Sequence, residues 1–209
     1  SLWIFTSLMR CCKRCCRRSE DGISKMKDME QLTELELAVF QLRMGFAPAD
    51  RCVDWAVERL RLDQEGDDLE VVLLASARGI DEVLPLADVI IERYRGAQRL
   101  DQQFLAGKYI VELRAAYLAG RESVASLDAI LTRLYPALAY PGWLTMLSRN
   151  CEYAMDVADF EQPFEDEFHY VASLWAQAES LAAFESAYSR ETSNRNDATG
   201  ASGGHLTVP

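Results

Sequence analysis

The sequence predicts an all-α protein, built as a single antiparallel bundle of about seven helices without a sheet. From Gln31 onward apolar residues recur at the three- and four-residue spacing of helices, and no stretch alternates like a half-buried strand. Glycines and prolines mark short connections between these periodic segments. A chain of 209 residues with 49% hydrophobic content is also long enough to bury a substantial core.

The first two expected helices lie between residues 31 and 60. The apolar face of the first helix starts near Gln31, and Gly45 ends it. Within it, Thr33 followed by Glu36 fits a capping box. Pro48 suits the first turn of the second helix. The apolar stripe of that second helix consists of Cys52, Val53, Ala56, Val57 and Leu60, with Trp55 at its flank.

Two further helices are expected before residue 96. A short one follows residues 67–68, and Gly79 is its expected C-terminal stop. Its apolar residues are Leu69, Val72 and Leu73. The next helix runs from about Asp81 to Arg95, and Gly96 closes it. Its inward-facing residues are expected to be Val83, Ala87, Ile90 and Tyr94.

The second half of the chain begins with a segment, 101–120, that is apolar on nearly every side. A helix of this kind belongs in the middle of a bundle. Ser123 then caps a helix that runs to about Leu134. Two prolines and a glycine make 135–143 a kinked connection.

The last two expected helices flank Pro163. One runs from about Trp143 to Val157, and a long final helix reaches from Phe164 to about Tyr188. Beyond it, residues 191–209 show no apolar period, which predicts a disordered tail. The helical domain is therefore expected to span 28–190.

Residues 1–27 are expected to form a basic, cysteine-rich N-terminal extension that is not part of the fold. Residues 1–29 carry seven basic and three acidic side chains, which leaves 15 basic and 30 acidic side chains for the rest of the chain. The whole chain has a net charge of −11, so the charge of the remainder is −15. The opening segment and the domain therefore have opposite charge.

The stretch "MRCCKRCCRR" at 9–18 holds four of the six cysteines. Three interpretations are open: a metal site with Cys-x-x-Cys spacing, a palmitoylated basic anchor, or an extension outside the domain. We favour the extension, because Met26 and Met29 lie directly before the first helical period. The remaining Cys52 and Cys151 lie far apart in apolar surroundings, which predicts reduced, buried thiols in a cytoplasmic protein.

Several function classes are not expected. An acidic body repels phosphate backbones, so direct nucleic-acid binding is not expected. The acidic charge fits a basic protein partner, and the alternative is that it serves solubility alone. No run approaches the roughly 18 apolar residues needed to span a bilayer, so no membrane association is expected. We find no glycine-rich phosphate loop, nucleophile elbow or paired zinc motif. The expectation is therefore a protein that is not an enzyme and uses no cofactor and no metal.

The candidate partner-binding site is the acidic run 152–167 with nearby aromatic residues. Such a surface steers the encounter with a basic protein, and aromatic side chains supply anchors for an interface. The predicted site residues are Tyr140, Trp143, Glu152, Tyr153, Asp156, Asp159, Phe160, Glu161, Glu165 and Asp166.

An alternative interpretation centres on His169. Glu165 precedes it by four residues and Asp166 by three, so the three side chains could share a helix face. The alternative is thus a helical-bundle metal protein or enzyme that uses Glu165, Asp166 and His169. A homodimeric structural protein is the remaining alternative.

The stretch "TELELAVFQLRMGFAPADRCVDWAVERL" (33–60) resembles the opening of small, acidic, all-helical bacterial immunity proteins, which are encoded beside secreted toxins. The shared features are an amphipathic helix, "RMGF", a proline-started turn and a helix that holds Asp54 and Trp55. The resemblance implies a cytoplasmic inhibitor that binds and neutralises a cognate toxin. Immunity families share no common set of binding residues, so the resemblance assigns none here.

Overall fold

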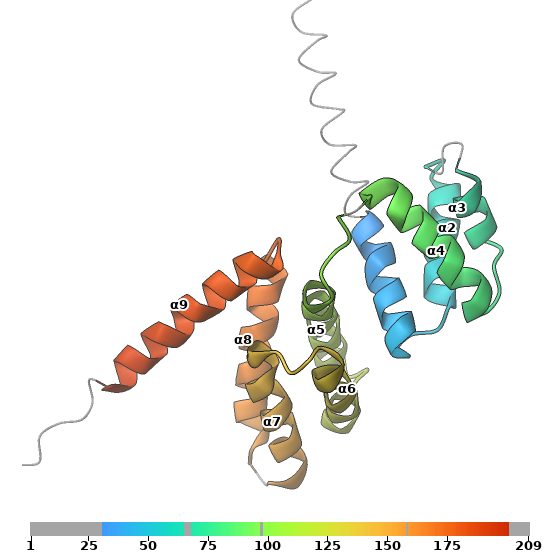
Figure 1. Cartoon of the computed structure of the whole chain (residues 1–209). Coiled ribbons are helices and arrows are strands. Elements are labelled where there is room, and N and C mark those ends of the chain that lie inside the picture. The colour runs from blue at the N-terminus through green and yellow to red at the C-terminus, as the bar shows by residue number, and fades with distance from the viewer. Residues whose placement is uncertain (1–30, 65–67, 97, 158, 201–209) are drawn as a thin grey trace, which may run out of the picture. The chain divides into compact units, whose positions relative to one another are not determined.

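The computed structural model describes residues 31–64, 68–96, 98–157 and 159–200, and every regular element in these ranges is an α-helix. The all-α class is therefore confirmed for the described part of the chain (Figure 1). After a helix at 31–44 come α2 (Asp50–Arg61), α3 (Leu69–Leu74), α4 (Ile80–Arg95), α5 (Gln102–Leu118), α6 (Val124–Ala137), α7 (Gly142–Asp156), α8 (Glu161–Gln177) and α9 (Leu181–Gly200).

The chain separates into two compact units, with the boundary between Arg99 and Leu100. The single antiparallel domain over 28–190 remains a prediction. The predicted extension 1–27 lies outside the described residues. Helix α9 continues through residue 200 and so overlaps the first ten residues of the predicted tail, 191–209.

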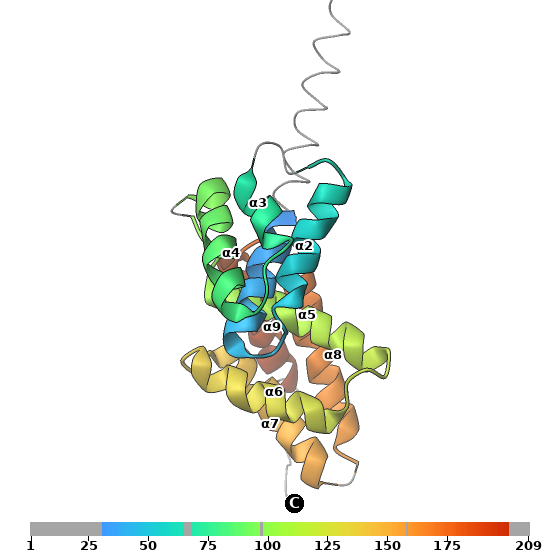
Figure 2. The same cartoon turned by 90° about the vertical axis from the view of Figure 1, so that its right-hand side faces the viewer.

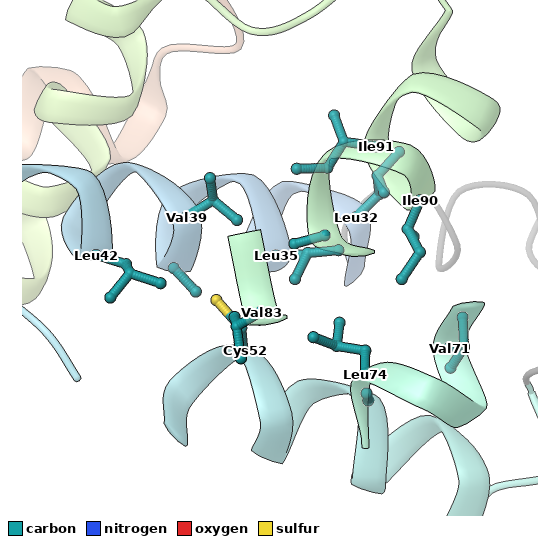
Figure 3. Packing of buried hydrophobic residues seen from close by; sticks show 13 residues of the cluster. Leu32, Leu35, Val39, Leu42, Cys52, Val71, Leu74, Val83, Ile90 and Ile91 are labelled. Carbon is teal, nitrogen blue, oxygen red and sulfur yellow. The ribbon is translucent and has the colours of Figure 1, made fainter. Parts of the chain in front are cut away.

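The first unit packs α2, α3 and α4 with the helix at 31–44 around one apolar cluster. In Figure 3 the side chain of Leu35 lies on the side of the first helix that faces Cys52 and Leu74. The predicted inward residues Val83, Ala87 and Ile90 are completely buried. Gly45 ends the first helix as predicted, since its positive φ of 68° allows the Phe46 amide to bond the Gln41 carbonyl at 2.8 Å.

The predicted capping box at Thr33 and Glu36 is wrong, because the helix is already formed at Gln31 and both side chains bind Arg95 of α4 instead. Arg95 Nε donates to the Glu36 carboxylate at 2.9 Å, and its Nη2 donates to Thr33 Oγ1 at 2.7 Å. The two charged side chains are only 9% and 4% exposed. Arg95 therefore takes the inward position predicted for Tyr94, which is 50% exposed.

The buried face of α3 also differs from the apolar pattern noted in the sequence. Leu69, Val72 and Leu73 are exposed, whereas Val71 and Leu74 are buried. The helix ends at Leu74, and Gly79 precedes α4 instead of ending α3. The orientation is set by Asp68, whose buried side chain caps α3 by accepting from the Glu70 amide and also binds Arg93 of α4 at 2.5 Å.

Arg93 also bonds the Glu70 carboxylate at 2.7 Å, and this hydrogen bond lowers the pKa of Glu70 from 4.5 to about 2. A depressed carboxyl pKa stabilises the fold above the unfolded value, and that contribution is lost as the pH falls from about 4.5 toward 2. We expect a carboxyl-detected NMR titration to place Glu70 near 2, and Arg93→Gln to raise its midpoint toward 4.5. Arg61→Gln, which removes a surface arginine elsewhere in the unit, should leave that midpoint unchanged. An unchanged midpoint in Arg93→Gln would contradict the assignment.

In the second unit α8 packs against α5, α7 and α9, while α6 packs on α7 (Figures 1 and 2). Within this unit α8 therefore has the central place that the sequence predicts for 101–120. The core is aromatic: Trp175 stacks on Phe184 with ring centroids 3.7 Å apart, and Trp143 and Phe104 meet it edge-on.

The predicted final helix, Phe164 to Tyr188, is two helices, α8 and α9. Ala178 between them has an extended backbone, with φ −74° and ψ 129°. Lys108 Nζ on α5 donates to the carbonyl oxygens of Trp175 and Ala178, both at 2.8 Å. Ser180 Oγ then accepts from the Ala183 amide at the start of α9. A distant lysine and a local cap thus stabilise the break. With this break, the described residues contain nine helices, whereas the sequence predicts about seven.

Candidate functional site

The acidic run predicted to bind a partner lies where α7 leads into α8, at one end of the second unit (Figure 1). Glu152 and Asp156 are exposed on the last turns of α7, Asp159 is exposed in the connection, and Glu161 is exposed at the start of α8. Because the chain reverses here, carboxylates from two helix ends and a connection come together. We call these four residues, with Tyr153 and Phe160, the acidic corner.

The acidic corner lies in a stretch of sequence that contains no lysine or arginine. Between Arg149 and Arg190 there are 40 residues without a lysine or arginine, and nine acidic ones. These nine are Glu152, Asp156, Asp159, Glu161, Glu165, Asp166, Glu167, Glu179 and Glu185. None of the four corner carboxylates forms an ion pair with a residue that the structure describes. The carboxylates of the corner are therefore not neutralised by ion pairs within the described part of the chain.

Apolar side chains are exposed beside these carboxylates. Tyr153 is 38% exposed and meets the Phe160 ring edge-on at 5.3 Å. Arg149 lies over the Tyr153 ring at 5.7 Å, which holds this ring in place. Met155 and Val157 are each 49% exposed. The acidic corner thus offers both charge and apolar contact area, the two components of a protein interface.

The structure separates two predicted aromatic anchors from this surface. Trp143 is 5% exposed, packs against Trp175 and Phe184, and donates from Nε1 to Gln103 Oε1 at 3.1 Å. It is a core residue and has no side-chain surface to offer a partner. Tyr140 is 65% exposed, but it lies in the connection between α6 and α7, at the opposite end of α7, and contacts Tyr135.

Glu165 and Asp166, the other predicted site residues, line a groove of about 210 Å³ between α5 and α8. The groove is lined by Arg114, Tyr117, Leu118, Gln162, Glu165, Asp166, Phe168 and His169. The Tyr117 hydroxyl lies 2.9 Å from a Glu165 carboxylate oxygen and 3.2 Å from one of Glu161. Burial, followed by the hydrogen bond to Glu165, raises the pKa of Tyr117. The phenol therefore stays protonated and links the groove to the acidic corner.

Sequence reasoning missed the α5 side of this groove, Arg114 and Tyr117. The apolar character of 101–120 predicts an interior helix, and no local pattern pairs Tyr117 with a residue 48 positions later. Tyr117 lies in the last turn of α5, which ends where Gly120 adopts a positive φ of 69° and the Arg121 amide bonds the Ala116 carbonyl.

The alternative metal site on α8 has no ligand cluster. His169 is exposed, and its Nδ1 lies 3.3 Å from Ser173 Oγ. Across the described residues, no three His, Cys, Asp or Glu side chains are grouped so that they could hold a metal ion. The cysteine cluster at 9–18 lies outside the described residues.

Cys52 and Cys151 are free and buried, as predicted. Burial raises the pKa of the Cys52 thiol to about 11 and that of Cys151 to about 12. Nucleophilic and metal-binding cysteines react as thiolates, so these two are protonated core residues at neutral pH.

Among the helices that the structure describes, none is both long and apolar enough to cross a membrane. Comparison of the chain with protein-family models, curated proteins and solved structures finds no match. The features of the described residues that bear on function are the acidic corner and the groove.

Proposed function

We propose that this chain is a cytoplasmic binding protein, most concretely an immunity protein or inhibitor that neutralises a cognate bacterial toxin through its acidic corner. One observation carries the proposal: the corner gathers four unpaired carboxylates and exposed apolar side chains within a stretch that lacks any lysine or arginine. The resemblance of residues 33–60 to immunity proteins supports the same function.

The charge has the sign needed to occupy a basic cleft, such as the phosphate-binding groove of a nuclease. Uncompensated carboxylates accelerate encounter with a positive surface and disfavour acidic competitors. Tyr153 and Phe160 are the aromatic anchors that the surface retains, because Trp143 is buried in the core. Since the corner is exposed, salt should screen its attraction for the partner.

The test is co-purification with the product of the neighbouring gene, combined with neutralisation of the corner. The triple variant Glu152→Gln/Asp156→Asn/Asp159→Asn removes three charges and keeps side-chain size. Each exposed pair contributes up to about 1 kcal/mol, so affinity at low salt should fall roughly tenfold to a hundredfold. Protection of cells that express the toxin gene should weaken in parallel.

The matched control is Asp54→Asn/Glu58→Gln/Asp63→Asn on and after α2. These residues are also exposed, the charge change is the same, and Asp63 shares with Asp159 a positive φ that asparagine tolerates. We expect affinity within about twofold of wild type. The absence of both complex and protection would reject the proposed function. An equal loss in both triple variants would show that net charge acts without a defined site.

A homodimer without another partner is the remaining alternative. Light scattering of the purified chain at increasing concentration measures its molar mass and so detects a homodimer. A homodimer whose interface covers the acidic corner would not bind a second protein there. No observation favours the metal protein or enzyme built on Glu165, Asp166 and His169.

A further inference from the structure

We propose that the groove between α5 and α8 receives one arginine side chain of the basic partner. This inference rests on the proposed function and extends it from a charged surface to a defined recognition pocket. The groove, of about 210 Å³, combines apolar walls from Leu118 and Phe168 with carboxylates from Glu165 and Asp166. Tyr117 adds a second aromatic ring, 6.1 Å from that of Phe168.

The carboxylates at the groove have no ion-pair partner among the residues that the structure describes. Glu161, Glu165 and Asp166 form no ion pair with any residue in the described ranges. Their contacts are the Tyr117 hydroxyl, near Glu161 and Glu165, and the Gln162 amide, which donates to Asp166 at 2.9 Å. The charge of this groove is therefore complementary to a cation.

Hydrogen-bond donors are also fewer than acceptors there. Tyr117 has one hydroxyl proton, but two carboxylate oxygens lie within 3.2 Å of its oxygen. The proton bonds the nearer oxygen, of Glu165, which leaves the oxygen of Glu161 facing a second acceptor. A group with several donors from outside the chain would satisfy the Glu161 oxygen and the lone pair of the phenol.

The shape of the lining favours guanidinium over ammonium. A guanidinium group is planar, stacks on aromatic rings and carries several donors in a fork that matches a carboxylate. Tyr117 provides a partly exposed ring, and Glu165 and Asp166 provide carboxylates, within one groove, while Phe168 is buried beneath it. An ammonium group is a more strongly hydrated point charge and gains less from the Tyr117 ring.

Arg114 gives the proposal a test in which two variants act in opposite directions. It lines the same groove but forms no ion pair with a described residue, so its charge repels an incoming cation. Removal of this charge should therefore tighten binding, whereas removal of the Glu165 charge should weaken it. A merely structural role for either residue would not produce opposite changes in affinity for the same probe.

The experiment uses the full chain and the peptide acetyl-Gly-Arg-Gly-amide, titrated by NMR while the Tyr117 and Phe168 ring resonances are followed. We expect these resonances to shift and saturate. Glu165→Gln, which keeps an acceptor for Tyr117, should weaken the affinity about fivefold, and Arg114→Gln should strengthen it about threefold. Glu179→Gln, an exposed neutralisation on the same acidic stretch but outside the lining, is the matched control and should leave the affinity unchanged.

Three results would overturn the groove assignment. They are shifts confined to residues 152–161, equal affinity in Glu165→Gln and Glu179→Gln, or equal binding of the lysine peptide acetyl-Gly-Lys-Gly-amide. None of these would affect co-purification with the neighbouring gene product, so failure of the groove and failure of the proposed function are distinguishable.

Discussion

Replacement of Gly107 by alanine should destabilise the second unit by about 3 kcal/mol, because the interior there has no space for one methyl group. Gly107 lies within α5 and is buried against Trp175 of α8. A Cβ at this position would lie 2.1 Å, 2.3 Å and 2.4 Å from three atoms of the indole ring. Non-bonded carbon atoms pack at about 3.5–4.0 Å, so the ring would have to move.

Movement of Trp175 disturbs the whole aromatic core. The side chain is completely buried, and its ring stacks on Phe184 at 3.7 Å with an interplanar angle of 5°. The next residues of α8 end at the break stabilised by Lys108, so the helix cannot slide without loss of those bonds. Alanine is favoured over glycine in a helix by about 1 kcal/mol, which is too little to offset this overpacking.

Urea denaturation monitored by tryptophan fluorescence measures the effect, with Gly142→Ala as the matched control. Gly142 is the first residue of α7, and a Cβ there meets nothing within 4 Å. That variant should be neutral or slightly stabilised. The double variant Gly107→Ala/Trp175→Leu should be less destabilised than the sum of the single changes, because a smaller side chain makes room for the methyl group. Equal stabilities of the two glycine variants would contradict the close packing.

Neutralisation of Glu36 should destabilise the first unit by about 3 kcal/mol, because it leaves the Arg95 charge buried without its partner. The two side chains are 4% and 9% exposed, and their bond is 2.9 Å long. Glu36→Gln keeps the shape and removes only the charge. The Thr33 hydroxyl, which also accepts from Arg95, is neutral and cannot replace a carboxylate.

The surface pair of Arg43 with Asp88 provides the comparison in the same unit. Its side chains are 46% and 31% exposed, and Asp88 keeps a second arginine, Arg99, at 3.3 Å when Arg43 is removed. Arg43→Met should therefore cost less than about 1 kcal/mol in thermal or urea denaturation. Replacement of both buried partners, Glu36→Met/Arg95→Met, should recover most of the stability lost in Glu36→Gln. If Glu36→Gln were as stable as Arg43→Met, the buried pair would contribute no more to stability than the surface pair.

The candidate site was predictable in part. The acidic run 152–167 is evident from the sequence, and its carboxylates lie where two adjacent helices meet, so neighbours in sequence are also neighbours in space. Trp143 shows the limit of this reasoning. The sequence predicts Trp143 as a surface anchor because acidic residues follow it closely. Its side chain instead contacts Trp175 and Phe184, which lie 32 and 41 positions later in the chain.

The sequence by itself determined the all-α class and most helix boundaries, because apolar period, caps and breaking residues act within a few positions along the chain. Only the tertiary structure decided that Thr33 and Glu36 bind Arg95 instead of forming a cap, that Lys108 stabilises a break between α8 and α9, and that Tyr117 faces Glu165. Each of these contacts joins residues from 48 to 70 positions apart. Local patterns cannot pair such residues, since the partner of a polar side chain is chosen by which helices pack together.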